Sequence, residues 1–104
     1  MEKYPKNYEM IQKKFSQLMT AHEEAGKIAK DSGPLDMKTA NLVQLAACVA
    51  LRSEGGVHSH VRRAMEAGAS KDDIYHTLAL LISTVGFPTT AAAFSWVNDL
   101  IGKK

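Results

Sequence analysis

Apolar residues recur along this chain at alternating steps of three and four residues, and no stretch shows the two-residue alternation of a β-strand. Such spacing places side chains on one face of an α-helix. The longest stripe predicts a first helix from about residue 6 to residue 30, ending before Pro34 because proline cannot continue a helix. A stripe so long and narrow predicts packing against another helix, from this chain or another subunit. Its members are Tyr4, Tyr8, Ile11, Phe15, Leu18, His22, Ala25 and Ala29.

Capping residues and glycines divide the remainder of the chain into four further predicted helices. Asp36 and Ser70 are placed to accept hydrogen bonds from the amides at helix starts. The Gly55-Gly56 pair is expected to interrupt the helical pattern, and Pro88 suits the first turn of the last helix. We therefore predict an all-α bundle of about five helices, the last four at about residues 37–53, 57–67, 71–85 and 88–101.

The chain has 104 residues, which suits one core, and we predict a single domain over residues 1–104. A hydrophobic content of 45% is high for so small a bundle, so part of the surface is expected to be buried in a homo-oligomer. The formal charge is only +2, and the 13 basic residues are interspersed with 11 acidic ones. This pattern predicts neither a nucleic-acid partner nor a membrane partner.

Cys48 is the only cysteine, so neither an intramolecular disulfide nor a CxxC redox pair can form. A reducing, cytoplasmic location is the resulting expectation. We also expect no targeting segment, because the first twenty residues lack a continuous apolar stretch. The alanine-rich surroundings of Cys48 predict a small buried side chain, not a reactive thiol.

Four histidines are the main source of acid–base chemistry. His22 and His76 are expected to be structural, because one lies on the apolar stripe and the other is spaced for a local pair with Asp72. His58 and His60 follow the only double glycine, but two residues apart on a helix they point to different faces. They do not form the paired zinc ligands of an HExxH motif, so no metal site is predicted. Proton transfer by a single histidine remains, and His60 is the candidate.

Charged residues bracket this glycine–histidine segment. The guanidinium groups of Arg52 and Arg62 suit a carboxylate, so we assign these two residues, with His58, to the binding of a small carboxylate ligand. Glu54 is a candidate to orient a histidine or to act as an acid. For each of these residues a solvated charged surface is the competing interpretation.

Three segments stand out as a set: residues 35–42 (LDMKTANL), residues 60–74 (HVRRAMEAGASKDDI) and residues 86–94 (GFPTTAAAF). In order and spacing they resemble the LdxKtrELi, HxxxALxxGAtxeEI and GxPxxxxAF segments of the carboxymuconolactone decarboxylase and AhpD-like alkylhydroperoxidase superfamily. The resemblance covers about residues 35–101, which would form the family core, with residues 1–33 as an N-terminal helix.

The resemblance implies an AhpD-like helical fold that assembles through intertwined subunits as a homotrimer or homohexamer. It also implies a site near the start of the third helix, often at a subunit boundary. In the peroxidase branch that site is a CxxC pair followed by histidine, with an upstream glutamate that relays protons. This chain has Ser53 and Gly56 at the two cysteine positions and Asn41 at the glutamate position, and only His60 remains. A dithiol peroxidase mechanism therefore has no thiol pair to use.

Three functional hypotheses follow. The first is a cofactor-free lyase or isomerase, in which His60 moves a proton, Arg52 or Arg62 holds a substrate carboxylate, and Glu54 or a neighbouring subunit orients the imidazole ring. The second is an oligomeric binding protein, or an enzyme of unassigned substrate. The third is residual peroxidase chemistry through Cys48. None of the three requires a cofactor.

Overall fold

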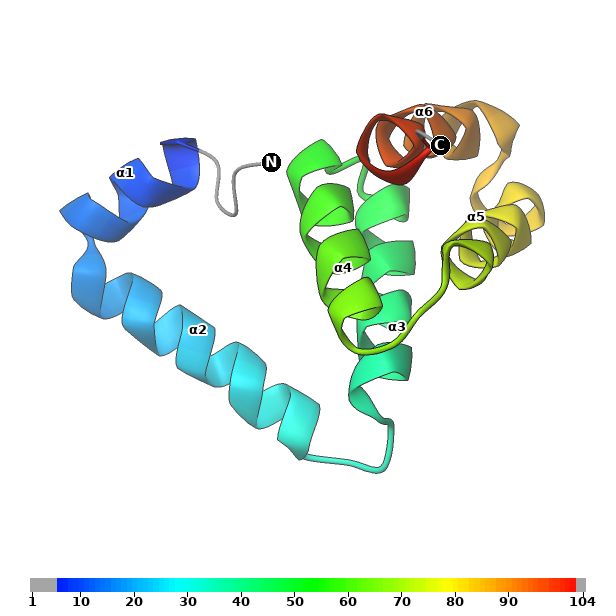
Figure 1. Ribbon diagram of the computed structural model, residues 1–104. Coiled ribbons are helices and arrows are strands. Elements are labelled where there is room, and N and C mark those ends of the chain that lie inside the picture. The colour runs from blue at the N-terminus through cyan, green and yellow to red at the C-terminus, as the bar shows by residue number, and fades with distance from the viewer. Residues whose placement is uncertain (1–5, 103–104) are drawn as a thin grey trace. The chain divides into compact units, whose positions relative to one another are not determined.

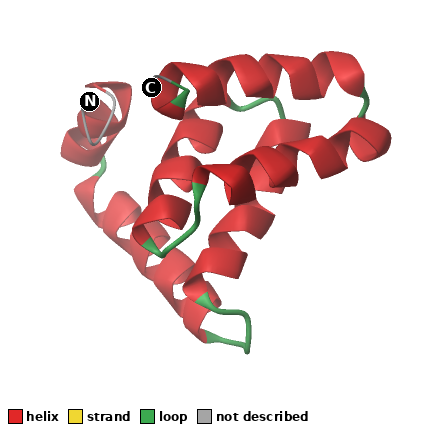
Figure 2. Ribbon diagram, turned by 45° about the vertical axis from the view of Figure 1, so that its right-hand side comes forward, coloured by secondary structure: helices red, strands yellow, loops and turns green. Residues whose placement is uncertain are grey.

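The computed structural model describes residues 6–102, and this part of the chain contains six α-helices and no strand (Figures 1 and 2). The predicted all-α fold class is confirmed. The chain forms two compact units, the first ending at Leu35 and the second beginning at Asp36. The helices are α1 (Lys6–Lys14), α2 (Ser16–Asp31), α3 (Met37–Ala50), α4 (Glu54–Glu66), α5 (Lys71–Val85) and α6 (Phe87–Ile101).

The first unit contains two helices where the periodicity predicted one. The backbone leaves helical geometry at Phe15, with φ −133° and ψ 58°, although hydrogen bonds continue on both sides of it. The bend brings α1 against α2, where the hydroxyl of Tyr8 and the amide of Gln12 both donate to Glu23. This contact between distant residues explains a break that local spacing could not predict.

No described residue of α1 or α2 is buried. Leu18, at the middle of the predicted apolar stripe, is 65% exposed, and Phe15 is 57% exposed. Tyr4, the first member of that stripe, lies outside the described residues. The predicted packing of the stripe against another helix therefore stays a prediction.

The second unit is built on an apolar core to which all four of its helices contribute. α3 packs against α4 as an antiparallel pair, and α5 and α6 complete the unit (Figure 1). Each helix supplies residues three or four positions apart, so each presents one apolar face to the core. The buried apolar residues are Leu45, Val49, Val57, Val61, Ala64, Ala69, Ile74, Leu78, Ala93 and Val97.

The predicted helix starts are largely confirmed in this unit. The carboxylate of Asp36 accepts from the amide of Thr39 at 2.8 Å, and Ser70 and Asp73 form a reciprocal capping box at 2.9 and 3.0 Å. α6 begins one residue before Pro88, after Gly86 has turned the chain at φ 97°. None of the described helices is both long and apolar enough to cross a membrane.

The start of α4 differs from the prediction, because the Gly55-Gly56 pair lies inside the helix and does not interrupt it. The interruption falls three residues earlier, where Arg52 adopts φ 57°, a left-handed conformation uncommon for a residue with a side chain. Ser53 then caps the helix, with its hydroxyl accepting from the amide of Gly56 at 3.1 Å. Both glycines therefore lie in the first turn of α4, directly after the cap.

Candidate functional site

The His60 side chain is joined to α3 by a hydrogen bond. His60 lies in the middle of α4 and is partly buried, and its Nδ1 is 3.1 Å from Oδ1 of Asn41. Asn41 is one of the two buried polar residues of the described chain, with 1% of its surface exposed. Its amide nitrogen donates to the carbonyl oxygen of Met37 at 2.9 Å. The imidazole is therefore held by a side chain that is itself fixed to the first turn of α3.

Cys48 of α3 lies against the first turn of α4. A Cβ atom added to Gly56 would be 2.6 Å from Sγ of Cys48 and 2.9 Å from Oγ of Ser53, both far closer than ordinary van der Waals contact. The sulfur thus fills the space that a side chain at position 56 would occupy. Burial raises the pKa of the Cys48 thiol, so the neutral form is favoured.

These contacts define a polar row between α3 and α4. On each of the two helices, the residues of the row are three and four positions apart. The residues from one helix therefore share one face of that helix. Oε1 of Gln44 is shielded from solvent and has no hydrogen-bond partner among the described residues. The row consists of Asn41, Gln44 and Cys48 on α3, and of Ser53, the N-cap of α4, with Gly56 and His60 on α4.

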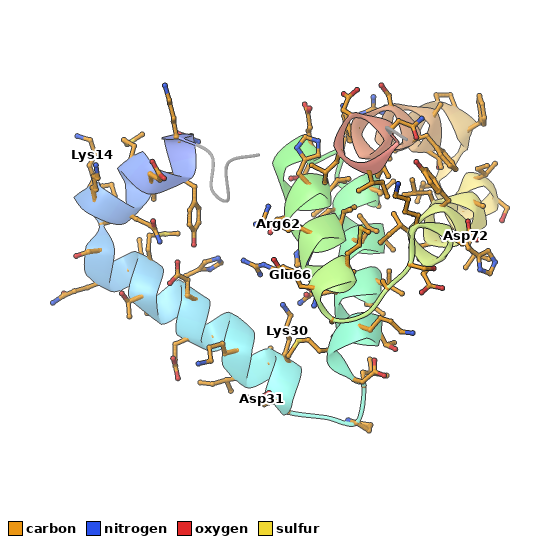
Figure 3. All side chains as sticks on the ribbon, viewed as in Figure 1. Lys14, Lys30, Asp31, Arg62, Glu66 and Asp72 are labelled. Carbon is orange, nitrogen blue, oxygen red and sulfur yellow. The ribbon has the colours of Figure 1, made fainter. Side chains whose placement is uncertain are left out.

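The predicted residues Glu54, His58 and Arg62 follow one another at four-residue steps along another face of α4. Nε2 of His58 is 4.0 Å from a carboxylate oxygen of Glu54, and Arg62 lies one turn from Glu66 (Figure 3). A step of two residues on a helix turns the side chain by about 200°. His58 and Arg62 are each two residues from His60, so within one subunit they lie on the opposite side of α4.

Arg52 occupies the turn between α3 and α4 and is exposed. Its Nη1 donates to the hydroxyl of Thr89, in the first turn of α6, at 2.7 Å. The side chain therefore ties the α3–α4 turn to the start of α6.

The sequence analysis gave no role to Asn41, which the structure places in hydrogen-bond contact with His60. The place of Asn41 in the LdxKtrELi-like segment was the available signal, because the resemblance aligned it with a proton-relaying glutamate. Orientation of a histidine was instead assigned to Glu54, which lies beside His58. The proximity of Cys48 to Gly56 was likewise missed, since the two residues belong to different helices. In residues 6–102, no three His, Cys, Asp or Glu side chains are grouped so that they could hold a metal ion.

Comparison with known proteins identifies the family. The sequence profile of the carboxymuconolactone decarboxylase family matches residues 14–99, most of the chain, and the chain therefore belongs to this family. A crystal structure of an apo carboxymuconolactone decarboxylase family protein from Legionella pneumophila is similar, with a TM-score of 0.77 and 24% sequence identity. The match covers 88% of this chain and 82% of that chain, and at this identity it shows a shared fold. No curated protein sequence matches the chain.

Proposed function

We propose that this carboxymuconolactone decarboxylase family protein is a cofactor-free lyase or isomerase that acts on a small carboxylate, with His60 as general acid and base. One observation carries the proposal: the His60 ring is held by the buried Asn41 at 3.1 Å, at the family position where a histidine is expected. A histidine ionises near neutral pH, and a fixed ring can take and return a proton in one defined direction.

Arginine side chains would supply the substrate contact. The planar guanidinium groups of Arg52 and Arg62 suit bidentate binding of a carboxylate. Because Arg62 lies on the side of α4 away from His60, we propose that it serves a site shared with a neighbouring subunit. The Arg52 side chain donates to Thr89, at the start of α6, and would leave this partner to bind the ligand.

A homotrimer or homohexamer is part of this proposal. Large apolar side chains of the second unit remain exposed, which supports their burial between subunits. They include Val43 (55% exposed), Leu51 (76%), Leu80 (60%) and Phe87 (63%). Light scattering coupled to gel filtration measures the assembly. The exchange Leu51→Glu is expected to weaken an oligomer in which that residue is buried, and a monomeric parent protein would contradict the proposal.

Dithiol chemistry is disfavoured on two grounds. Ser53 and Gly56 occupy the positions of the two cysteines, and the pKa of the remaining thiol, Cys48, is raised by burial. A thiolate is needed to attack a peroxide, and burial disfavours it. We therefore expect Cys48→Ser to leave any peroxide consumption unchanged, and its loss in this variant would revive the peroxidase hypothesis.

The test of the proposed function begins with a set of small carboxylate lactones and related acids. Turnover, and incorporation of deuterium from heavy water into the compound, are followed by NMR. We expect His60→Gln to abolish both, while the matched exchange His76→Gln, on the exposed side of α5, retains them. Full turnover by His60→Gln would rule out the mechanism. A compound that binds without turnover or exchange would favour the alternative, a non-catalytic oligomeric binding protein.

A further inference from the structure

We infer that Asn41 is a positioning residue that fixes the tautomer of His60, so that Nε2 is the nitrogen that exchanges protons with the substrate. The inference deepens the proposed function and rests on it. It concerns the atom of His60 that performs the chemistry, and it follows from a chain of hydrogen bonds running from the backbone of α3 to the imidazole ring.

The groups around Asn41 fix the orientation of its side-chain amide. The two ends of an asparagine side chain differ, because its nitrogen only donates hydrogen bonds and its oxygen only accepts them. A backbone carbonyl also only accepts, so the end of Asn41 that faces the carbonyl of Met37, 2.9 Å away, must be the nitrogen. Asn41 is 1% exposed, and water therefore does not compete for these contacts. The oxygen consequently faces His60.

The orientation of Asn41 decides which ring nitrogen of His60 carries the proton. Oδ1 of Asn41 has no hydrogen to give, so the 3.1 Å contact is a hydrogen bond only when Nδ1 of His60 carries one. A neutral imidazole has a single N–H, and its other nitrogen then carries the lone pair. The reverse tautomer would direct two lone pairs at each other, one of them on the buried Asn41. The neutral ring is therefore protonated on Nδ1 and basic at Nε2.

This tautomer also decides where the proton of the substrate goes during the reaction. Nε2 takes a proton from a carbon of the substrate, and the electron pair of the broken C–H bond stays on the substrate. The ring becomes an imidazolium whose Nδ1–H still donates to Asn41. An amide cannot accept that second proton, whereas a glutamate at this position would be able to relay it. His60 therefore holds the proton until Nε2 returns it to the substrate or to solvent.

The tautomer is measured without any substrate. Protein labelled with nitrogen-15 gives correlations between ring nitrogens and carbon-bound ring protons, and those of His60 are assigned by their loss in His60→Gln. We expect the Nδ1–H tautomer in the parent protein. Asn41→Asp keeps an acceptor at this place and should retain that tautomer, whereas Asn41→Leu removes the acceptor and should shift the ring toward the Nε2–H form. Asn98→Asp makes the same chemical change on α6, where Asn98 accepts from Tyr75, and should leave the His60 signals in place.

The outcomes separate this inference from the proposed function. An Nε2–H tautomer in the parent protein would overturn the role of Asn41, even if His60 proves essential for turnover. An Nδ1–H tautomer in a protein whose His60→Gln variant is fully active would overturn the catalytic proposal. If Asn41→Leu does not fold, as judged by circular dichroism, the spectra of the parent protein and of Asn41→Asp decide the matter. On the identified substrate, kcat of Asn41→Leu should fall by about tenfold or more while Asn41→Asp restores most of it.

Discussion

Two faces of α4 arise from the same short segment but meet different surroundings. Gly56 and His60 face α3, where Cys48 fills the space beside the glycine and the buried Asn41 holds the imidazole. His58 and Arg62 extend from the other side of the helix, where His58 lies 4.0 Å from the exposed carboxylate of Glu54. The difference teaches that residues adjacent in a motif need not belong to one site. On a helix, steps of three and four residues bring side chains together, and a step of two separates them.

The largest expected effect distinguishes the two faces by activity. His60→Gln should lower kcat by about 10²–10⁴-fold, the usual contribution of a general acid or base. Arg62→Gln should raise KM and leave kcat nearly unchanged, because uniform binding of a carboxylate lowers the energies of bound substrate and transition state alike. Steady-state kinetics on an identified substrate measures both. An equal loss of kcat in the two variants would show that both faces act in the chemical step.

The second prediction compares the neighbouring glycines. Gly56→Ala should destabilise the fold by about 1–3 kcal/mol, because its methyl group would overlap Cys48 and Ser53. Gly55→Ala is the matched control: no atom lies within 4 Å of its added Cβ, and alanine favours the helix by up to about 1 kcal/mol. Urea unfolding measures both changes.

Cys48→Ala tests the cause of the Gly56 effect. If the sulfur is the obstacle, Gly56→Ala should cost less in a Cys48→Ala background, and a double-mutant cycle gives the coupling. Equal costs in the two backgrounds would assign the effect to Ser53 or to the backbone.

The third prediction uses pH. Because burial raises the pKa of the Cys48 thiol, its folded state binds the proton more tightly than the unfolded chain does. The contribution to stability is therefore present below the ordinary thiol pKa and is lost as the pH rises through the folded value. Alkylation by iodoacetamide near pH 8 should be several times slower in the folded protein than in urea. Equal alkylation rates in the folded and the unfolded protein would show that the thiol is exposed to solvent and does not belong to the polar row between α3 and α4.

The smallest effect is expected at Glu54, an exposed residue in the first turn of α4. Glu54→Gln should change the free energy of unfolding by less than about 0.5 kcal/mol, since the Glu54 carboxylate is 56% exposed and lies as far as 4.0 Å from Nε2 of His58. Thermal unfolding at low and high salt measures the change. A larger loss, or a marked loss of turnover, would indicate that Glu54 acts in a site completed by another subunit.

The fold was predictable to the extent that it depends on local chemistry. Apolar spacing identified the helices, and the side chains of Asp36 and Ser70 marked two of their starts, because a cap bonds to amides within one turn of itself. The bend at Phe15 was not predictable in this way. It depends on the contacts of Tyr8 and Gln12 with Glu23, which lies 15 and 11 residues further along the chain, respectively.

For the candidate site too, local sequence decided some features and tertiary packing decided the others. The sequence by itself determined that a dithiol is absent and that His58 points away from His60, because composition and helical spacing suffice for these two conclusions. The resemblance to the family added that His60 is the residue of its motif that remains. Only the tertiary structure decided that Asn41 holds His60 across 19 residues and that Cys48 occupies the space beside Gly56. The packing of α3 against α4 creates these contacts, and no local property of either helix encodes which of their side chains meet.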